Sequence, residues 1–399
     1  MANVSSSNGL EKRPRLAFRN TDGSHFPCWR QTSLGCIIEP YSEKVYGEHD
    51  YEVLTSAREG LQRQEDHFGS KQRHDTDGYN IIPFGYCTYR NRSDDGKFAF
   101  NINTISEKAI VSKFYPVFRF TNANSTFMAE FLNSSPRVKK KLSVLAVGTS
   151  QVVLSFEALK AAKFDLPCKD EQDKIAAFLE CLNTRIENQR TLVVALKKYK
   201  RGVVDGIFSR KLNFSYPQTW AELEISELFM PISDKGYSDK IVLTIVQGEG
   251  TMPRDSVDRR IAYDKSTISS YKRVLPNDFI LHLRSFEGGL EIVNEEGVVS
   301  PAYTILRARN EIIPLFFYTF FRSYWFINSK LRISVEGIRD GKSINMNTFW
   351  HIKVPVPSIE EQRHISALIS SIDNRIKIAE FEYKRLLQIR VGLMQQFFI

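Results

Sequence analysis

Side chains able to carry acid–base, metal or nucleophilic chemistry are scattered along this sequence without a familiar spacing. The seven histidines form no HExxH or comparable metal-binding arrangement. The five cysteines include no CxxC pair, so neither a zinc site nor a disulfide framework is indicated. Gly248-Glu249-Gly250 is only a fragment of a glycine-rich loop, and no Asn-Pro-Pro-Tyr motif of amino-methyltransferases occurs. The sequence therefore predicts no catalytic residue, no metal site and no cofactor site in this chain.

Two polar, basic turns each follow a stretch that is typical of a β-strand. The expected strands are residues 84–89 and 279–283, and they lead into the turns 90–97 and 284–289. Further along each half, the pattern predicts a helix (124–142 and 311–330) and then a polar loop near Gly148 or Gly337. The globular parts are thus expected to mix strands, turns and some helix.

Composition narrows the class of protein. The 399 residues contain no run of about 18 apolar residues, and the first residues lack the apolar segment of a secretory signal. A cytoplasmic protein without membrane contact is therefore expected. The net charge is +9, but residues 213–356 carry 17 basic and 17 acidic side chains. Bulk charge is thus weak support for a polyanionic partner, and a local basic patch would be needed.

The chain is an internal repeat. Ten residues from Pro167 to Phe208 are identical to the residues 190 positions later, without a gap. Weaker matches precede this segment at offsets of 188 to 193, including Trp29 with Trp220 and residues 111–115 with 299–303. Two halves of about 190 residues therefore share one plan, in which a divergent globule is followed by a better-matched segment.

The better-matched segments predict two long helices. Acidic residues follow Pro167 and Pro357, which favours helix starts, and apolar residues then recur at alternating spacings of three and four. Each helix would have about 38 residues and a length of about 57 Å. Such a sustained heptad pattern predicts a coiled coil, and the chain order makes an antiparallel pair the expected arrangement. The alternative is two ordinary helices, each packed on its own globule.

The helix starts also carry a recognisable motif. The pattern Pro-x-x-x-Glu-Gln-x-x-Ile occurs at 167–175 and again at 357–365, and each helix closes with a Lys/Arg-x-Gly pattern and a phenylalanine. With this duplicated motif behind divergent globules, the sequence resembles the specificity (S) subunit of type I restriction–modification enzymes over nearly its whole length.

The resemblance implies an α+β fold. Two mixed α/β target-recognition domains would lie in tandem, separated by two long helices that form an antiparallel coiled coil, in a pseudo-twofold internal repeat. The expected boundaries are residues 15–160 for the first domain, 161–210 for the first helix, 211–352 for the second domain and 353–399 for the second helix.

The resemblance also implies a function. Each domain would read one half of a bipartite, asymmetric site on double-stranded DNA, and the helices would set the unread gap and dock two modification (methyltransferase) subunits. S-adenosylmethionine, ATP and Mg²⁺ would be held by partner subunits and not by this chain, and restriction (translocase and nuclease) subunits could join. The chain itself would be a non-catalytic recognition subunit.

Candidate residues follow from this implied role. Arg and Lys suit guanine, and Asn and Gln suit adenine, in the major groove, while phosphate contacts only position the protein. The candidates for DNA contact are Arg90, Asn91, Arg92, Lys97, Thr149, Ser150, Gln151, Arg284, Ser285, Arg339 and Lys342. Each could equally be a solvated turn residue, and Tyr86 and Tyr89 are expected to pack in the core. The candidates for the coiled-coil or partner interface are Ile175, Leu179, Leu182, Ile186, Val193, Leu196, Ile365, Ile369, Ile372, Ile376, Leu386 and Leu393.

Two other functions remain open at this point. The chain could be a stand-alone DNA-modifying enzyme with an unfamiliar centre, or a coiled-coil assembly protein without sequence-specific DNA binding.

Overall fold

The computed structural model describes residues 14–69, 75–212, 219–257, 265–282, 289–337 and 343–398. The chain divides into two compact units, Met1–Gln189 with Glu382–Ile399, and Arg190–Phe381. Each unit contains one globule and a segment of both long helices. Arg284, Ser285, Arg339 and Lys342, which the sequence proposes as DNA contacts, lie outside the described residues.

The first unit is built on two four-stranded sheets and two short ladders. One sheet has the order β2 (Ile38–Tyr41), β10 (Val117–Phe120), β6 (Cys87–Tyr89) and β8 (Phe100–Ile102). The other has the order β4 (Gly60–Arg63), β3 (Glu52–Ala57), β9 (Lys108–Val111) and β5 (Asn80–Pro83). The ladders pair β1 (Arg30–Ser33) with β12 (Lys163–Leu166), and β7 (Arg92–Ser93) with β11 (Val152–Val153). The short helices are α1 (Gln64–Phe68), α2 (Ser125–Ser134), α3 (Pro136–Leu145), α4 (Phe156–Ala161) and the 3₁₀ turn Leu34–Cys36.

The second unit repeats this plan with changes. Its four-stranded sheet has the order β14 (Phe229–Ile232), β21 (Tyr303–Ala308), β18 (Phe279–His282) and β19 (Glu291–Ile292). Two-stranded ladders pair β13 (Ala221–Glu224) with β24 (Lys353–Val356), β15 (Leu243–Val246) with β16 (Gly250–Pro253), β17 (Lys272–Val274) with β20 (Gly297–Val299), and β22 (Val335–Glu336) with β23 (Ser343–Ile344). The short helices are α6 (Ile225–Leu228), α7 (Pro314–Phe321) and α8 (Met346–Trp350), with a π turn at Phe326–Lys330 and 3₁₀ turns at Arg254–Ser256, Lys265–Ser270 and Leu331–Ser334.

Three local predictions need correction. The helix expected at 124–142 is two helices, because Ser135 caps a new helix through its hydroxyl and Pro136 occupies the first position of α3. The helix expected at 311–330 ends at Phe321 and continues only as the π turn. The strand expected at 84–89 begins at Cys87, because Gly85 adopts a φ of 80° in a turn between β5 and β6.

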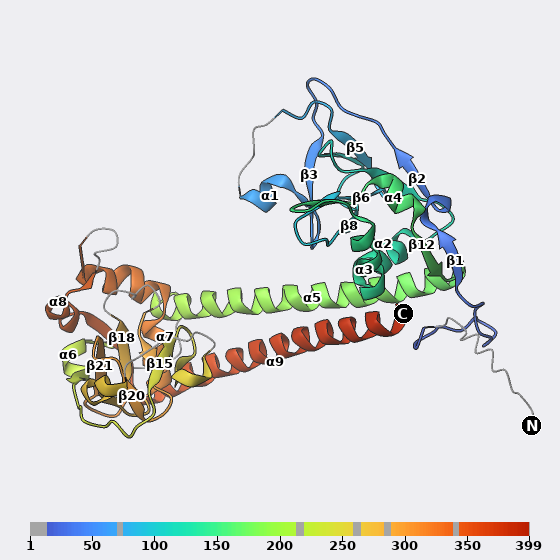
Figure 1. Cartoon of the computed structure of the whole chain (residues 1–399). Coiled ribbons are helices and arrows are strands. Elements are labelled where there is room, and N and C mark those ends of the chain that lie inside the picture. The colour runs from blue at the N-terminus through green and yellow to red at the C-terminus, as the bar shows by residue number, and fades with distance from the viewer. Residues whose placement is uncertain are drawn as a thin grey trace, which may run out of the picture. The chain divides into compact units, whose positions relative to one another are not determined.

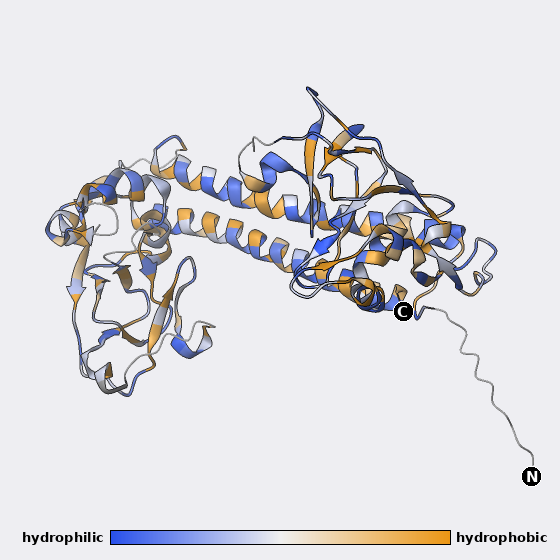
Figure 2. Ribbon diagram, turned by 45° about the horizontal axis from the view of Figure 1, so that its top comes forward, coloured by the Kyte–Doolittle hydropathy of each residue, from blue (hydrophilic) through white to orange (hydrophobic). Residues whose placement is uncertain are grey.

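The two long helices predicted from the heptad pattern are confirmed. Helix α5 runs from Lys169 to Phe208 and α9 from Ile359 to Phe397, each without interruption (Figure 1). Within each unit, the beginning of one helix lies against the end of the other, so the pairing is antiparallel in both. Apolar and polar residues alternate along both ribbons (Figure 2), as a seam that faces a partner helix on one side and water on the other requires.

The ends of this seam also belong to the globule cores. In the first unit Ile175 and Leu179 of α5 are buried in one cluster with Trp29 and with Phe397 of α9. In the second unit Ile365 and Ile369 of α9 are buried with Val203 and Ile207 of α5, against the aromatic residues of α7. The structure therefore combines the two alternatives. The same apolar residues pack against the other long helix and against the core of a globule.

All the residues proposed for the helix interface are buried or half-buried. Ile175, Leu179, Ile186, Ile365, Ile369, Ile372, Ile376 and Leu386 are buried, and Leu182, Val193, Leu196 and Leu393 are half-buried. Whether these residues also contact a partner subunit stays a prediction.

The repeated glutamine of the Glu-Gln motif joins each long helix to its globule. Gln172 donates from Nε2 to the carbonyl of Pro167 (3.0 Å) and accepts the backbone N–H of Asn124 at Oε1 (2.9 Å). Gln362 does the same with the carbonyl of Pro357 (3.0 Å) and the N–H of Ile313 (3.0 Å). Asn124 and Ile313 are the N-cap residues of α2 and α7. This buried amide therefore satisfies a helix terminus and fixes where each long helix begins.

Candidate nucleic-acid interface

In the first unit, the two segments proposed from the sequence lie side by side. Strand β7, inside the turn 90–97, pairs with β11, directly after the loop 148–151. The N–H of Leu154 donates to the carbonyl of Asn91 (2.9 Å), and Gln151 Nε2 donates to Asp94 Oδ1 (3.0 Å). Six of the proposed contacts are thereby exposed on neighbouring loops, namely Arg90, Arg92, Lys97, Thr149, Ser150 and Gln151, while Asn91 is half-buried. Whether they touch DNA stays a prediction.

Asp95 organises the turn that carries these side chains. Its carboxylate accepts the hydroxyl of Ser93 (2.9 Å) and the backbone N–H of Lys97 (3.2 Å), and it pairs with Arg58 (2.8 Å). These donors, the Ser93 hydroxyl first, lower the pKa of Asp95 to about 2. The turn is therefore held by a carboxylate that stays ionised at neutral pH, and Lys97 (Nζ–Oδ2 3.4 Å) is partly committed to it.

Aromatic packing beneath this surface agrees with the expectation for the two tyrosines. Tyr89 is fully buried and donates its hydroxyl to the carbonyl of Leu154 (3.0 Å). Tyr86 is half-buried and packs edge-on against Tyr41, with ring centroids 5.1 Å apart. Burial raises the pKa of Tyr89, so its hydroxyl is a structural donor at neutral pH.

Two groups of exposed side chains on this edge were not singled out from the sequence. The first is on α3, where Arg137, Lys139 and Lys140 are exposed and no acidic residue occurs. Helix α3 lies close to the turn, since a Cβ on Gly96 would be 2.6 Å from Ser143 Oγ. The second is Phe114, whose exposed ring lies beneath Arg92. A run of lysines on a short helix was a usable signal, but its position beside the turn depends on the fold.

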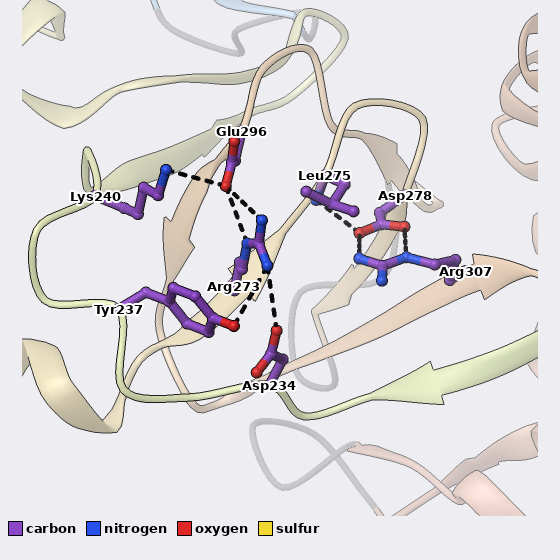
Figure 3. A network of polar contacts seen from close by, with 8 residues as sticks. All are labelled: Asp234, Tyr237, Lys240, Arg273, Leu275, Asp278, Glu296 and Arg307. Carbon is purple, nitrogen blue, oxygen red and sulfur yellow. Dashed lines mark hydrogen bonds and ion pairs between the residues drawn. The ribbon is translucent and has the colours of Figure 1, made fainter.

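Two arginines of the second unit, Arg273 and Arg307, are held in ion pairs (Figure 3). Arg273 of β17 pairs with Glu296 (2.8 Å), donates to the Tyr237 hydroxyl (3.3 Å) and stacks over that ring at 4.6 Å. Arg307 of β21 binds the buried carboxylate of Asp278 through two hydrogen bonds of 2.7 and 2.6 Å. Hydrogen bonding to Glu296 and to Asp278 raises the pKa of Arg273 and of Arg307. These two arginines thus brace the strands and are poor candidates for phosphate contacts.

Comparison with known families settles what kind of chain this is. A profile for the type I restriction modification DNA specificity domain matches residues 40–196 and again residues 217–388. The chain belongs to the type I restriction–modification DNA specificity family. The two matches reproduce the internal repeat, and each covers one globule with most of the helix that follows it.

Relatives of this specificity-domain chain are distant. The chain is 22% identical over 255 positions to the type I restriction enzyme MjaX specificity subunit of Methanocaldococcus jannaschii. This alignment covers 59% of this chain and 58% of that protein. The MjaVIII specificity subunit of the same organism is 23% identical over 215 positions, 52% of this chain and 47% of that protein. The chain thus aligns with only about half the length of the curated relatives that it matches.

Solved structures share the fold over nearly the whole chain. The S subunit of a type I restriction–modification system from M. genitalium superposes with a TM-score of 0.55 at 17% identity and covers 97% of this chain and 99% of that one. A chain from a study of type I R-M complex assembly gives a TM-score of 0.56 at 16% identity, over 93% and 97% of the two chains. At such low identity these likenesses establish the architecture of a specificity subunit and no residue role.

An open pocket of about 840 Å³ lies within the second unit of this specificity-family chain, between α5, α7 and α9. Its walls include Lys200, Arg201, Lys377 and Arg322. Lys200 pairs with Asp373, and Arg322 pairs with the buried Glu291, so much of this positive charge is balanced inside the unit.

Over the residues that the structure describes, no group of three or more His, Cys, Asp or Glu side chains could hold a metal ion. Within the same residues, no helix is both long and apolar enough to cross a membrane. Cys87 is buried, and burial raises the pKa of its thiol, so it is a core residue and not a nucleophile.

Proposed function

We propose that this chain is the DNA-recognition subunit of a type I restriction–modification complex, and that each globule reads one half of a bipartite, asymmetric site. The observation that carries this proposal is a repeated scaffold with divergent loops. The same sheet and helix-start contacts recur in both units, whereas the turn 90–97 and its neighbouring loop have no close counterpart in sequence. Two copies of one scaffold with different loops suit two different half-sites.

The long helices suit a spacer of fixed length. Each is continuous over 40 or 39 residues, and a helix of that length spans about 60 Å. Their partly polar seam contains cross-helix pairs such as Lys197 with Glu380 (2.7 Å) and Lys200 with Asp373 (2.6 Å). Such pairs fix the register of one helix against the other, which is what a ruler between two half-sites needs.

The helices also offer a surface for the modification subunits. Leu192 and Tyr199 are exposed seven residues apart on α5, and Ile378 and Phe381 are exposed three residues apart on α9. Residues at these spacings share a helix face, and exposed apolar side chains in such numbers favour a protein contact. Replacing Ile378 and Phe381 together by serine should release the modification subunits. Val391→Ser, at an exposed α9 position in the first unit, is the matched control.

The chemistry is assigned to the partners. We propose that S-adenosylmethionine is bound by the modification subunits, that ATP and Mg²⁺ are used by restriction subunits where these join, and that this chain contributes recognition only. A stand-alone DNA-modifying enzyme is the competing function. It predicts methyl transfer by the purified chain with S-adenosylmethionine and DNA, and that result would replace the present proposal.

The decisive experiment is hydroxyl-radical footprinting of the chain reconstituted with its modification subunits. The proposal expects two protected blocks that flank a gap whose sequence does not affect affinity. A coiled-coil assembly protein without DNA specificity predicts no defined blocks, and that outcome would refute the proposal.

A further inference from the structure

The turn 112–115 of the first unit recurs at 300–303 in the second unit, but with a different residue at its tip. In the first unit the N–H of Tyr115 donates to the carbonyl of Ser112 (2.9 Å), and the N–H of Phe114 approaches Ser112 Oγ (3.5 Å). In the second unit Tyr303 and Ala302 make the same two contacts with Ser300, at 3.1 and 3.4 Å. The backbone of the turn is therefore repeated, while its tip residue is Phe114 in one half and Ala302 in the other.

Both turns are braced from the adjoining strand. The buried Asn80, on β5, donates Nδ2 to the carbonyl of Tyr115 (2.9 Å). In the second unit Lys272, on β17, donates Nζ to the carbonyl of Tyr303 (2.6 Å). A turn held from below presents its tip in one orientation, so little conformational entropy is lost when the tip meets a ligand.

The ring of Phe114 is exposed between two cations. It is 51% exposed, and the Arg92 guanidinium and the Lys113 ammonium lie 5.2 and 5.8 Å from its centroid. A single exposed phenylalanine is not unusual, but this ring is on a turn held from below and lies between two cations, and that arrangement suits a contact with another molecule. Arg92 also belongs to β7, beside the turn 90–97 and the loop 148–151. The aromatic tip thus lies on the proposed DNA-contacting edge.

We propose that Phe114 is a specificity-determining residue of the first half-site, whose ring contacts the bases while Arg92 and Lys113 hold the flanking phosphates. Apolar side chains reach thymine methyl groups in the major groove and wedge between base steps elsewhere, and phenylalanine does both. The two cations over the ring match the phosphates that border any such base contact. Ala302 and Pro301, at the equivalent turn, offer neither an aromatic ring nor a charge, so the first half-site alone would have this contact.

The inference rests on the proposed function and is tested in the reconstituted complex with its modification subunits. Wild type and Phe114→Ala each select duplexes from a library with randomised positions, and affinities are then measured on the wild-type duplex. The variant carries the residue that the equivalent turn already tolerates, so its fold should persist. We expect preference to be lost at one or two adjacent positions of the first half-site, with affinity falling about ten-fold and the second half-site unchanged.

Matched variants separate the roles. Phe84 is 60% exposed and follows β5 at the opposite end of β9, so Phe84→Ala should leave selection unchanged. Arg92→Gln and Lys113→Gln should each lower the slope of log affinity against log salt by about one without changing the selected bases. Ala302→Phe should alter only the second half-site.

The outcomes are distinct for the two proposals. If the wild-type complex selects no bipartite site, the proposed function fails and this inference with it. If the wild type selects a site and Phe114→Ala selects the same bases with the same affinity, the inference alone is overturned. A loss that is equal for all duplexes, or that appears in the second half-site, also overturns it, because it would show a structural role.

Discussion

Lys200 on α5 pairs with Asp373 on α9, with 2.6 Å between Nζ and Oδ1, and the repeat places the same contact in the other unit as Arg390 with Asn183. The second contact joins Nε to Oδ1 at 2.8 Å. Both residues of each pair are 190 positions from their counterparts. The duplicated helices therefore keep not only their apolar pattern but also a cross-helix polar contact, which fixes the antiparallel register in both units.

Arg390 has an additional partner, Glu130 of α2, so we expect mutations of the two pairs to have unequal effects. Arg390 also makes a double hydrogen bond to Glu130 of α2 (2.8 and 2.7 Å), whose side chain is only 15% exposed. Arg390→Ala would take the cation from that carboxylate, leave it with the neutral donors Asn183 and Ser134, and should destabilise the first unit by about 2 kcal/mol. Lys200→Ala breaks a more exposed pair and should cost less than about 1 kcal/mol. Hydrogen exchange of the α2 and α7 amides measures both effects, and equal losses would contradict this reading.

The motif glutamines should act as independent joints. Gln172→Ala removes a donor and an acceptor from buried backbone groups and should cost the first unit about 1–3 kcal/mol. Gln362→Ala should do the same in the second unit, and the double variant should show the sum, because the two joints share no partner. Gln395→Ala, at an exposed position of α9, is the control. Strong coupling between the two variants in urea unfolding would show that the joints are not local.

Much of this architecture could be predicted from the sequence because it is periodic or repeated. The heptad pattern predicted α5 and α9, and the Glu-Gln motif marked their starts. The break between α2 and α3 also has a local signal, because Ser135-Pro136 combines an N-cap residue with a proline at the first helical position. The single helix predicted at 124–142 did not take this signal into account. By contrast, the heptad pattern cannot predict which globule residues pack against the ends of the two long helices, because those contacts join distant parts of the chain.

The candidate interface was only partly predictable. Strand β6 and the polar turn after it are local features, and both were identified. The pairing of β7 with β11 joins residues about 60 positions apart, so the sequence could not show that Arg92 and Gln151 are neighbours. Phe114 was overlooked because an aromatic residue in a strand-rich region is ordinarily expected in the core.

Acid should loosen the turn 90–97 within a defined range. The pKa of Asp95 is lowered to about 2 by the Ser93 hydroxyl and its other donors, so its contribution is present in full above the ordinary pKa of 3.8. The contribution is lost as the pH falls from about 4 to about 2. The amide resonances of Ser93 and Lys97 should therefore hold their positions from pH 7 to about 4 and then shift. In Asp95→Asn this step should be absent, and a shift near pH 6 would point to a different group.

Lengthening both helices by one heptad should change the gap and nothing else. Duplicating residues 187–193 in α5 and 377–383 in α9 preserves the seam and the polar pairs on either side. The insertion adds about 10 Å of helix, or about three base pairs of DNA. The selected site should therefore keep both half-site sequences and gain a longer spacer. Altered half-sites with an unchanged spacer would show that the helices are not the ruler.

The central claim is that each globule reads its own half-site. Replacing the proposed DNA-contacting loops of one globule tests this claim most directly. The turn 90–97 and the loop 148–151 are replaced together by Gly-Ser segments of equal length in the reconstituted complex, and bound duplexes are selected from a randomised library and sequenced. The account predicts that one half-site loses its sequence preference while the other half-site and the spacer are unchanged. Loss of preference in both half-sites, or in neither, would contradict it.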